Sequence, residues 1–221
     1  MDLEALSPDR TKQTIGEIGF WCGLLASGFT GTFLIVQLLQ LFRLIPYPLD
    51  QILIFGSSLG IALPLMVAML ALHHIAPIEK KFWSHAALLF TVMYVIFVTA
   101  NYIVQLSTVI PMTLKGRVAE IVILQQTPHS LLWDFDAIGY LFMGLAALFA
   151  FPVFKKHGSE KPVRYVFLAH ALVTPLIVFV YFYPDFSEHL LLLAAPWAIT
   201  APLFMLLLAL NFKKDLTLKS L

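Results

Sequence analysis

The chain has 221 residues, of which 60% are hydrophobic and 12% charged, and its mean hydropathy is +0.87. Soluble domains carry about 45–50% apolar and about 25% charged residues, so this composition predicts an integral membrane protein. A net charge of +1 excludes nucleic acid as an expected partner, because DNA and RNA are held by Lys and Arg side chains that neutralise phosphates. The single cysteine, Cys22, excludes a disulfide within this sequence and a cysteine-based metal cluster.

Residues 1–14 mix acidic and basic side chains, whereas a secretory signal opens with a basic, non-acidic region. We therefore interpret this segment as a cytoplasmic N-terminal tail. Six apolar runs follow, each bounded by proline, glycine or charged residues and each long enough to cross a bilayer as a helix. The sequence predicts an all-α, polytopic membrane bundle over 15–212 and a cytoplasmic C-terminal tail over 213–221. The expected transmembrane helices cover about 15–42, 51–75, 83–110, 132–154, 163–183 and 189–212.

The distribution of Lys and Arg predicts the orientation of these six helices. Positive residues near the ends of membrane spans are retained in the cytoplasm. On the side of the termini lie Arg10, Lys12, Lys80, Lys81, Lys155, Lys156, Lys161, Arg164, Lys213, Lys214 and Lys219, whereas the other side carries Arg43, Lys115 and Arg117. We therefore expect a multi-pass protein of the inner or plasma membrane with both termini in the cytoplasm.

The connection over 111–131 is then external. Its stretch 117–125 has apolar residues at Val118, Ile121, Val122 and Leu124, which is typical of a short helix lying in the membrane interface.

Polar residues at membrane depth are costly unless they face the bundle interior, a cavity or each other. On the third predicted helix, Tyr94, Asn101 and Gln105 lie at positions i, i+7 and i+11, which share one helix face. On the fourth, Asp136 and Tyr140 share a face at i, i+4. Asn101 and Gln105 form one pair, and Asp136 and Tyr140 form another. We expect both pairs to lie at the same depth in the outer half of the membrane.

These stripes predict an outward-facing, aromatic-lined polar pocket that binds or transports a small amphipathic molecule. The expected ligand-binding residues are Gln37, Tyr94, Asn101, Gln105, Asp136 and Tyr140. For Asn101 and Gln105 an alternative stays open, because amide side chains on transmembrane helices often only hydrogen-bond neighbouring helices. Asp136 is the strongest candidate, since a carboxylate at this depth needs water, a cation, a hydrogen-bond donor or a proton.

Four histidines and a glutamate are expected on the cytoplasmic side, namely His73, His74, His85, His170 and Glu17. Three imidazoles and a carboxylate can bind Zn²⁺ with an open position, so an intramembrane metal-dependent enzyme acting on lipid is the alternative function. Histidines near the interface more often face headgroups or water. We therefore assign no metal, no cofactor and no catalytic residue from the sequence.

Small residues recur at every fourth position of the first predicted helix, at Gly23, Ser27 and Gly31. Such a pattern lets two helix backbones approach closely. It fits packing within the bundle, and it also fits a structural or regulatory subunit that contacts a membrane partner or a second copy through this helix.

Overall fold

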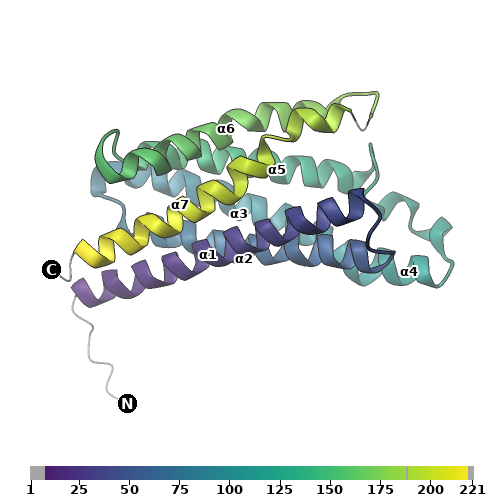
Figure 1. The fold of residues 1–221 in the computed structure, drawn as a ribbon, viewed down its shortest axis with the longest axis horizontal. Coiled ribbons are helices and arrows are strands. Elements are labelled where there is room, and N and C mark those ends of the chain that lie inside the picture. Colours follow the sequence, from purple (N-terminus) through teal and green to yellow (C-terminus); the bar gives the residue numbers. More distant parts are fainter. Residues whose placement is uncertain (1–7, 188, 219–221) are drawn as a thin grey trace, which may run out of the picture.

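Every apolar run of the sequence forms a helix in the computed structural model, which describes residues 8–187 and 189–218. The long helices are arranged antiparallel along one axis, and the described part of the chain begins and ends at the same end of the bundle (Figure 1). We call this the terminal end and the opposite one the far end. The long helices are α1 (Pro8–Leu41), α2 (Leu49–Ile75), α3 (Lys81–Val104), α5 (Leu131–Ala150), α6 (Lys161–Phe182) and α7 (Trp197–Leu218).

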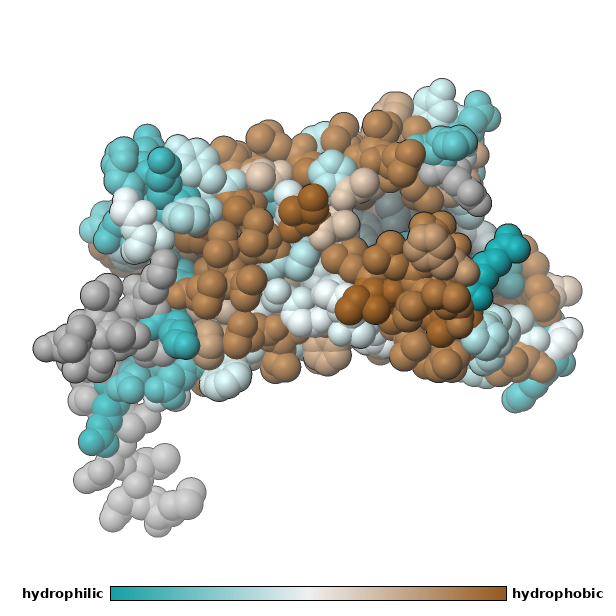
Figure 2. All heavy atoms as spheres, viewed as in Figure 1, coloured by the Kyte–Doolittle hydropathy of each residue, from teal (hydrophilic) through white to brown (hydrophobic). Residues whose placement is uncertain are grey.

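Six segments of the described chain are long and apolar enough to cross a membrane, which confirms the predicted six-span, all-α bundle. On the face seen in Figure 2, hydrophobic residues predominate along the middle of the molecule and hydrophilic residues gather toward its two ends. Exposed side chains such as Trp21, Ile35 and Leu172 are more than half accessible, as expected for groups that face lipid. The molecule is therefore built for a lipid bilayer.

The six spans form a closed ring in the order of the sequence. Each long helix packs against the next one, and the ring closes where α1 lies along α7. Short connections between antiparallel helices favour this neighbour-to-neighbour arrangement. The two closing helices lie side by side near the terminal end and diverge toward the far end (Figure 1).

Small residues of α1 make the closing contact within the chain. A Cβ atom added at Gly23 would lie 2.9 Å from the Cβ of Ala209, so the two backbones are as close as glycine allows. The Ser27 hydroxyl donates a hydrogen bond to the Pro202 carbonyl, at 3.0 Å. A Cβ atom added at Gly31 would meet no other atom within 4 Å, so Gly31 takes no part in this contact. Two of the three small residues thus serve packing inside the bundle.

The ends of the helices differ from the expected bounds at both termini. α1 begins at Pro8 rather than near residue 15, because proline is well tolerated in the first turn and the following polar residues are compatible with a helix. α7 continues to Leu218, into the segment expected to be a tail. The expected tail residues 1–7 and 219–221 lie outside the described residues.

The third span is longer than expected because α3 does not end at Pro111. It continues through a π-helical turn, Gln105–Val109, into α4 (Ile110–Leu114), where Pro111 occupies the first turn. The connection that follows contains two 3-10 turns, Val118–Glu120 and Val122–Leu124, in place of the expected interfacial helix. Ile121 between them is 2% exposed, so this apolar residue packs onto the protein.

The last span is interrupted near the far end. It starts as a 3-10 turn, Leu190–Ala194, and becomes α-helical only at Trp197. Pro196 lies at the break, where its missing N–H and its ring prevent a continuous helix. The 3-10 turn before the break packs against α6.

The interior is packed in its terminal half and hollow in its far half. Phe167, Met205, Leu208 and Phe212 are fully buried between the helices in the terminal half. The far half also buries side chains, among them Gln105 and Val180, but a large cavity lies between its helices.

Candidate functional site

A cavity of about 710 Å³ occupies the far half of the ring, and side chains of all six spans line it. Figure 2 shows the surface hollowed in this half of the molecule. Small-molecule sites typically measure about 300–1,000 Å³ and combine apolar walls with a few polar groups. The polar lining residues are Gln37 and Gln40 of α1, Gln51 and Ser58 of α2, Gln126 of the long connection and Asp136 of α5.

The start of α5 positions one face of the cavity. The Ser130 hydroxyl accepts a hydrogen bond from the Trp133 N–H at 3.2 Å and thereby caps the helix. One face of α5 carries Trp133, Asp136 and Tyr140, which are spaced at positions i, i+3 and i+7. All three line the cavity.

Asp136 is anchored by two tyrosine hydroxyls. Tyr102 of α3 donates to Oδ1 at 2.7 Å, and Tyr181 of α6 donates to Oδ2 at 2.5 Å. The Asp136 residue is 2% exposed and lies in the cavity wall. A buried carboxyl group without such partners would be strongly destabilising in a membrane protein, so the two tyrosines explain how it is retained here.

Aromatic rings form a continuous series along the cavity wall. Ring centroids are 4.4 Å apart between Trp133 and Tyr181, 5.8 Å between Tyr181 and Tyr140, and 5.4 Å between Tyr140 and Trp197. The series ends at Phe33 of α1, 5.7 Å from Trp197. The Trp133 indole N–H donates to the Tyr181 carbonyl at 3.1 Å and fixes the first ring. Such ring contacts give a rigid wall that needs little ordering when a ligand binds.

One polar atom in this wall has no partner. The Trp197 Nε1 donor is buried and makes no hydrogen bond among the described residues. Buried donors are almost always satisfied in proteins, so an unsatisfied one at a cavity indicates a place for an acceptor from a bound molecule or water.

Three of the six predicted ligand-binding residues meet at the cavity: Gln37, Asp136 and Tyr140. Two others, Asn101 and Gln105, do not line it. The Asn101 amide donates to Gln126 Oε1 at 3.0 Å, and the Gln105 amide donates to the Leu124 carbonyl at 2.7 Å. They hold the connection after α4 against the bundle, which is the hydrogen-bonding role that the sequence left open for them. Gln126 lines the cavity, and the Asn101 side chain also interacts with the lining residue Asp136.

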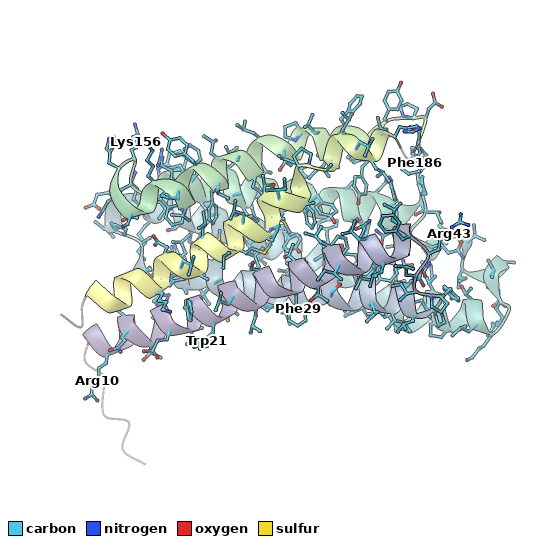
Figure 3. All side chains as sticks on the ribbon, in the orientation of Figure 1. Arg10, Trp21, Phe29, Arg43, Lys156 and Phe186 are labelled. Atoms are coloured by element: carbon cyan, nitrogen blue, oxygen red, sulfur yellow. The ribbon has the colours of Figure 1, made fainter. Side chains whose placement is uncertain are left out.

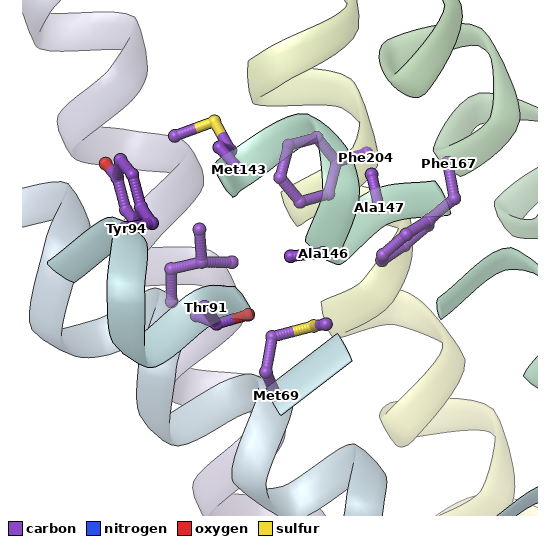
Figure 4. Close-up of a pocket in the computed structure, with 9 residues that line it drawn as sticks. Met69, Thr91, Tyr94, Met143, Ala146, Ala147, Phe167 and Phe204 are labelled. Carbon is purple, nitrogen blue, oxygen red and sulfur yellow. The ribbon is translucent and has the colours of Figure 1, made fainter. Parts of the chain in front are cut away.

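Tyr94, the sixth residue, lies closer to the terminal end. It lines a separate cavity of about 10 Å³ together with Met143 and Phe204 (Figure 4). That volume is close to the minimum for one water molecule, so this space is too small for an organic ligand.

Sequence reasoning missed Tyr102, Tyr181 and Trp197 as wall residues. Tyr102 directly follows Asn101 and lies outside the helix face that passes through Asn101 and Gln105. Tyr181 shares a helix face with His170 and Thr174, which is a signal in the sequence, but this face was not connected with Asp136. Trp197 belongs to a span without a polar stripe, and its signal is the enrichment of aromatic residues near the far end.

The histidines of the alternative enzyme hypothesis are distributed over separate contacts. His73 Nδ1 lies 2.9 Å from the Ser84 hydroxyl, and the His73 and His85 ring centroids are 5.3 Å apart. His170 instead lies against α7, with Nδ1 3.1 Å from the Thr200 hydroxyl. Within residues 8–187 and 189–218, no three His, Cys, Asp or Glu side chains are placed to hold a metal ion.

Comparisons of this chain with protein-family models, with curated proteins and with solved structures found no match, so the function is argued from the cavity alone.

Proposed function

We propose that the protein binds a small amphipathic molecule in the far-half cavity. The observation that carries the proposal is the combination of a ligand-sized space of about 710 Å³ with an apolar aromatic wall and one anchored carboxyl group. An apolar wall takes up the body of an amphipathic molecule, and a few fixed polar groups orient its head. The partnerless Trp197 donor supports the same interpretation.

The packing of the terminal half supports binding of a ligand more directly than transport of that ligand across the membrane. Fully buried side chains, among them Phe167, Leu208 and Phe212, fill the interior between the cavity and the terminal end. Transport would require these helices to separate. Pro64, Pro175 and Pro202 lie inside α2, α6 and α7, where the missing backbone hydrogen bonds make bending less costly.

Filling the cavity tests the binding proposal. Ala198 lines the cavity, whereas the adjacent Ile199 is 68% exposed on the outer surface of the same helix. We expect wild-type protein, released gently from membranes, to carry an organic molecule that native mass spectrometry detects. An Ala198→Trp variant should lose that mass because the indole occupies its space, and the matched Ile199→Trp variant should retain it. A bound mass that is absent from wild-type protein, or unchanged in Ala198→Trp, would contradict the proposal.

We also propose that the terminal end faces the cytoplasm of an inner or plasma membrane, so that the cavity lies in the outer half of the bilayer. Lys80, Lys155 and Lys156 lie in connections at the terminal end, which supports this orientation through the retention of positive residues in the cytoplasm.

Cysteine labelling in intact cells tests the orientation. In a Cys22→Ala background, a membrane-impermeant maleimide should label Lys115→Cys at the far end. It should label Lys156→Cys only after the cells are permeabilised. The reverse pattern would show that the cavity lies on the cytoplasmic side.

A further inference from the structure

We propose that the ligand of the far-half cavity is an organic cation, an amine or quaternary ammonium compound with an apolar body. This inference rests on the proposed function and specifies the chemical class of the ligand. It is drawn from the charge of the cavity, the state of the hydrogen bonds at Asp136 and the arrangement of the aromatic rings.

No basic residue lines the cavity among the described residues. Among the described residues that line it, Asp136 is the one side chain of the Asp, Glu, Lys, Arg and His types. A second carboxyl group stands directly behind the wall, because Asp50 Oδ2 accepts a hydrogen bond from the lining residue Gln40 at 2.9 Å. Arg43, which follows α1, is exposed at the far end and does not line the cavity (Figure 3). A positive ligand would therefore supply a counter-charge that these lining residues lack.

The protein groups that surround the Asp136 carboxyl group are all neutral: two tyrosine hydroxyls and the amide side chains of Asn101 and Gln126. Both tyrosine hydroxyls donate, one to each carboxylate oxygen, and each oxygen of an ionised carboxylate has a second lone-pair position. This geometry is that of an acceptor held in place by neutral donors. An ammonium group is a hydrogen-bond donor, or in its quaternary form a pure positive charge, and it complements such an acceptor.

The aromatic wall adds the second element of cation recognition. Tyr140 and Tyr181 contact one another at 5.8 Å between centroids, and Trp133 and Trp197 continue the wall on either side of them. Cations bind to the faces of Trp and Tyr rings, and several such rings around one space form the sites that bind quaternary ammonium groups. The same rings and the neighbouring Phe33 suit the apolar body of the ligand.

Anionic and neutral amphiphiles fit these groups less well. An anion would face Asp136 with no basic residue in the described lining to offset the repulsion. A neutral alcohol can donate to Asp136 and accept from the Trp197 indole N–H, but it gains nothing from the charge of the carboxylate. The discriminating measurement is therefore a comparison of head groups on an otherwise identical ligand.

Three photoreactive probes make that comparison. They share one alkyl chain with a diazirine and end in a trimethylammonium, a hydroxyl or a carboxylate group. Each is titrated into full-length protein in nanodiscs of digalactosyldiacylglycerol, a neutral lipid without an ammonium group. Mass spectrometry measures labelling of α5 and α7 peptides that an excess of unlabelled probe abolishes. We expect the trimethylammonium probe to reach half-maximal labelling at a concentration lower by about tenfold or more than the other two, as for one charge-assisted contact.

Matched variants test whether Asp136 and Tyr140 cause the preference for the trimethylammonium probe. Asp136→Asn keeps the size of the side chain but removes the charge, so the three probes should then label within about twofold of one another. Asp134→Asn, on the same helix but outside the cavity lining, should leave the preference unchanged. Tyr140→Leu should reduce the preference by removing a ring, and Tyr140→Phe should retain it. The Tyr140 pair decides the matter if Asp136→Asn does not fold.

The outcomes separate the two proposals. Saturable labelling of cavity peptides by the hydroxyl or carboxylate probe, equal to or better than by the ammonium probe, would reject the cation and leave ligand binding intact. A preference that survives both Asp136→Asn and Tyr140→Leu would also reject it. If no probe labels these peptides saturably, the cavity is not a binding site for such amphiphiles, and the proposed function fails with this inference.

Discussion

Replacing Asp136 with leucine is expected to lower the free energy of unfolding by about 2–5 kcal/mol, because two tyrosine hydroxyls lose their acceptor at once. Tyr102 is 5% exposed and Tyr181 packs between Trp133 and Tyr140, so no other side chain is at hand to replace the lost acceptor without a rearrangement of the wall. Unfolding in mixed micelles with increasing sodium dodecyl sulfate measures the change.

Two controls separate the loss of the acceptor from a general effect of the substitution. Asp134→Leu, in the first turn of the same helix, should lose only about 0.5 kcal/mol through the helix dipole. A triple variant with Asp136→Leu, Tyr102→Phe and Tyr181→Phe should recover most of the lost stability, because no unsatisfied polar group remains. If Asp136→Leu alone is as stable as the wild type, the two hydrogen bonds contribute little and the carboxyl group is not anchored as described.

Replacing Gly144 with alanine is expected to destabilise the bundle by about 2–3 kcal/mol, as overpacking typically does. An added Cβ atom would overlap the Thr174 hydroxyl oxygen and would lie 2.5 Å from the Thr174 Cβ. The second of these atoms is attached directly to the backbone of α6, so a side-chain rotation does not relieve the clash and α5 and α6 have to separate. The same unfolding assay tests this prediction.

Gly56→Ala provides the matched control. It places the same atom in a helix at a position where no other atom lies within 4 Å, and alanine has the higher helix propensity by about 1 kcal/mol. This variant should be as stable as the wild type or more so. Equal stability of the two alanine variants would mean that α5 and α6 are less closely packed at Gly144 than the structure shows.

The architecture was predictable because the bilayer imposes it. Runs of about 20 apolar residues between polar or proline-containing segments allow one structure in lipid, a helix with all its backbone hydrogen bonds satisfied. The long runs around Leu65 or Ile177 therefore identified their helices unambiguously. The helix ends were harder to predict, because a proline is compatible with several local structures. Pro8 begins a helix, Pro111 lies in a span that continues past a π-helical turn, and Pro196 interrupts a span.

The candidate site was predictable only in part. Asp136 stood out because an acidic residue at membrane depth needs a partner, and Tyr140 shares its helix face. Asn101 and Gln105 carry the same signal in the sequence, yet they hold the connection at Leu124 and Gln126. Helical spacing gives the face on which a side chain lies, but not the segment that covers this face.

The sequence by itself determined that this protein has six membrane spans and that Asp136 and Tyr140 share one helix face. Both features follow from local composition and helical periodicity. Only the tertiary structure decided that the helices form a ring in chain order, that Tyr102 and Tyr181 hold Asp136, and that the interior is filled at one end and hollow at the other. These depend on which helices become neighbours and how closely, at Gly144 or Gly23 for example, and such contacts join residues far apart in the chain.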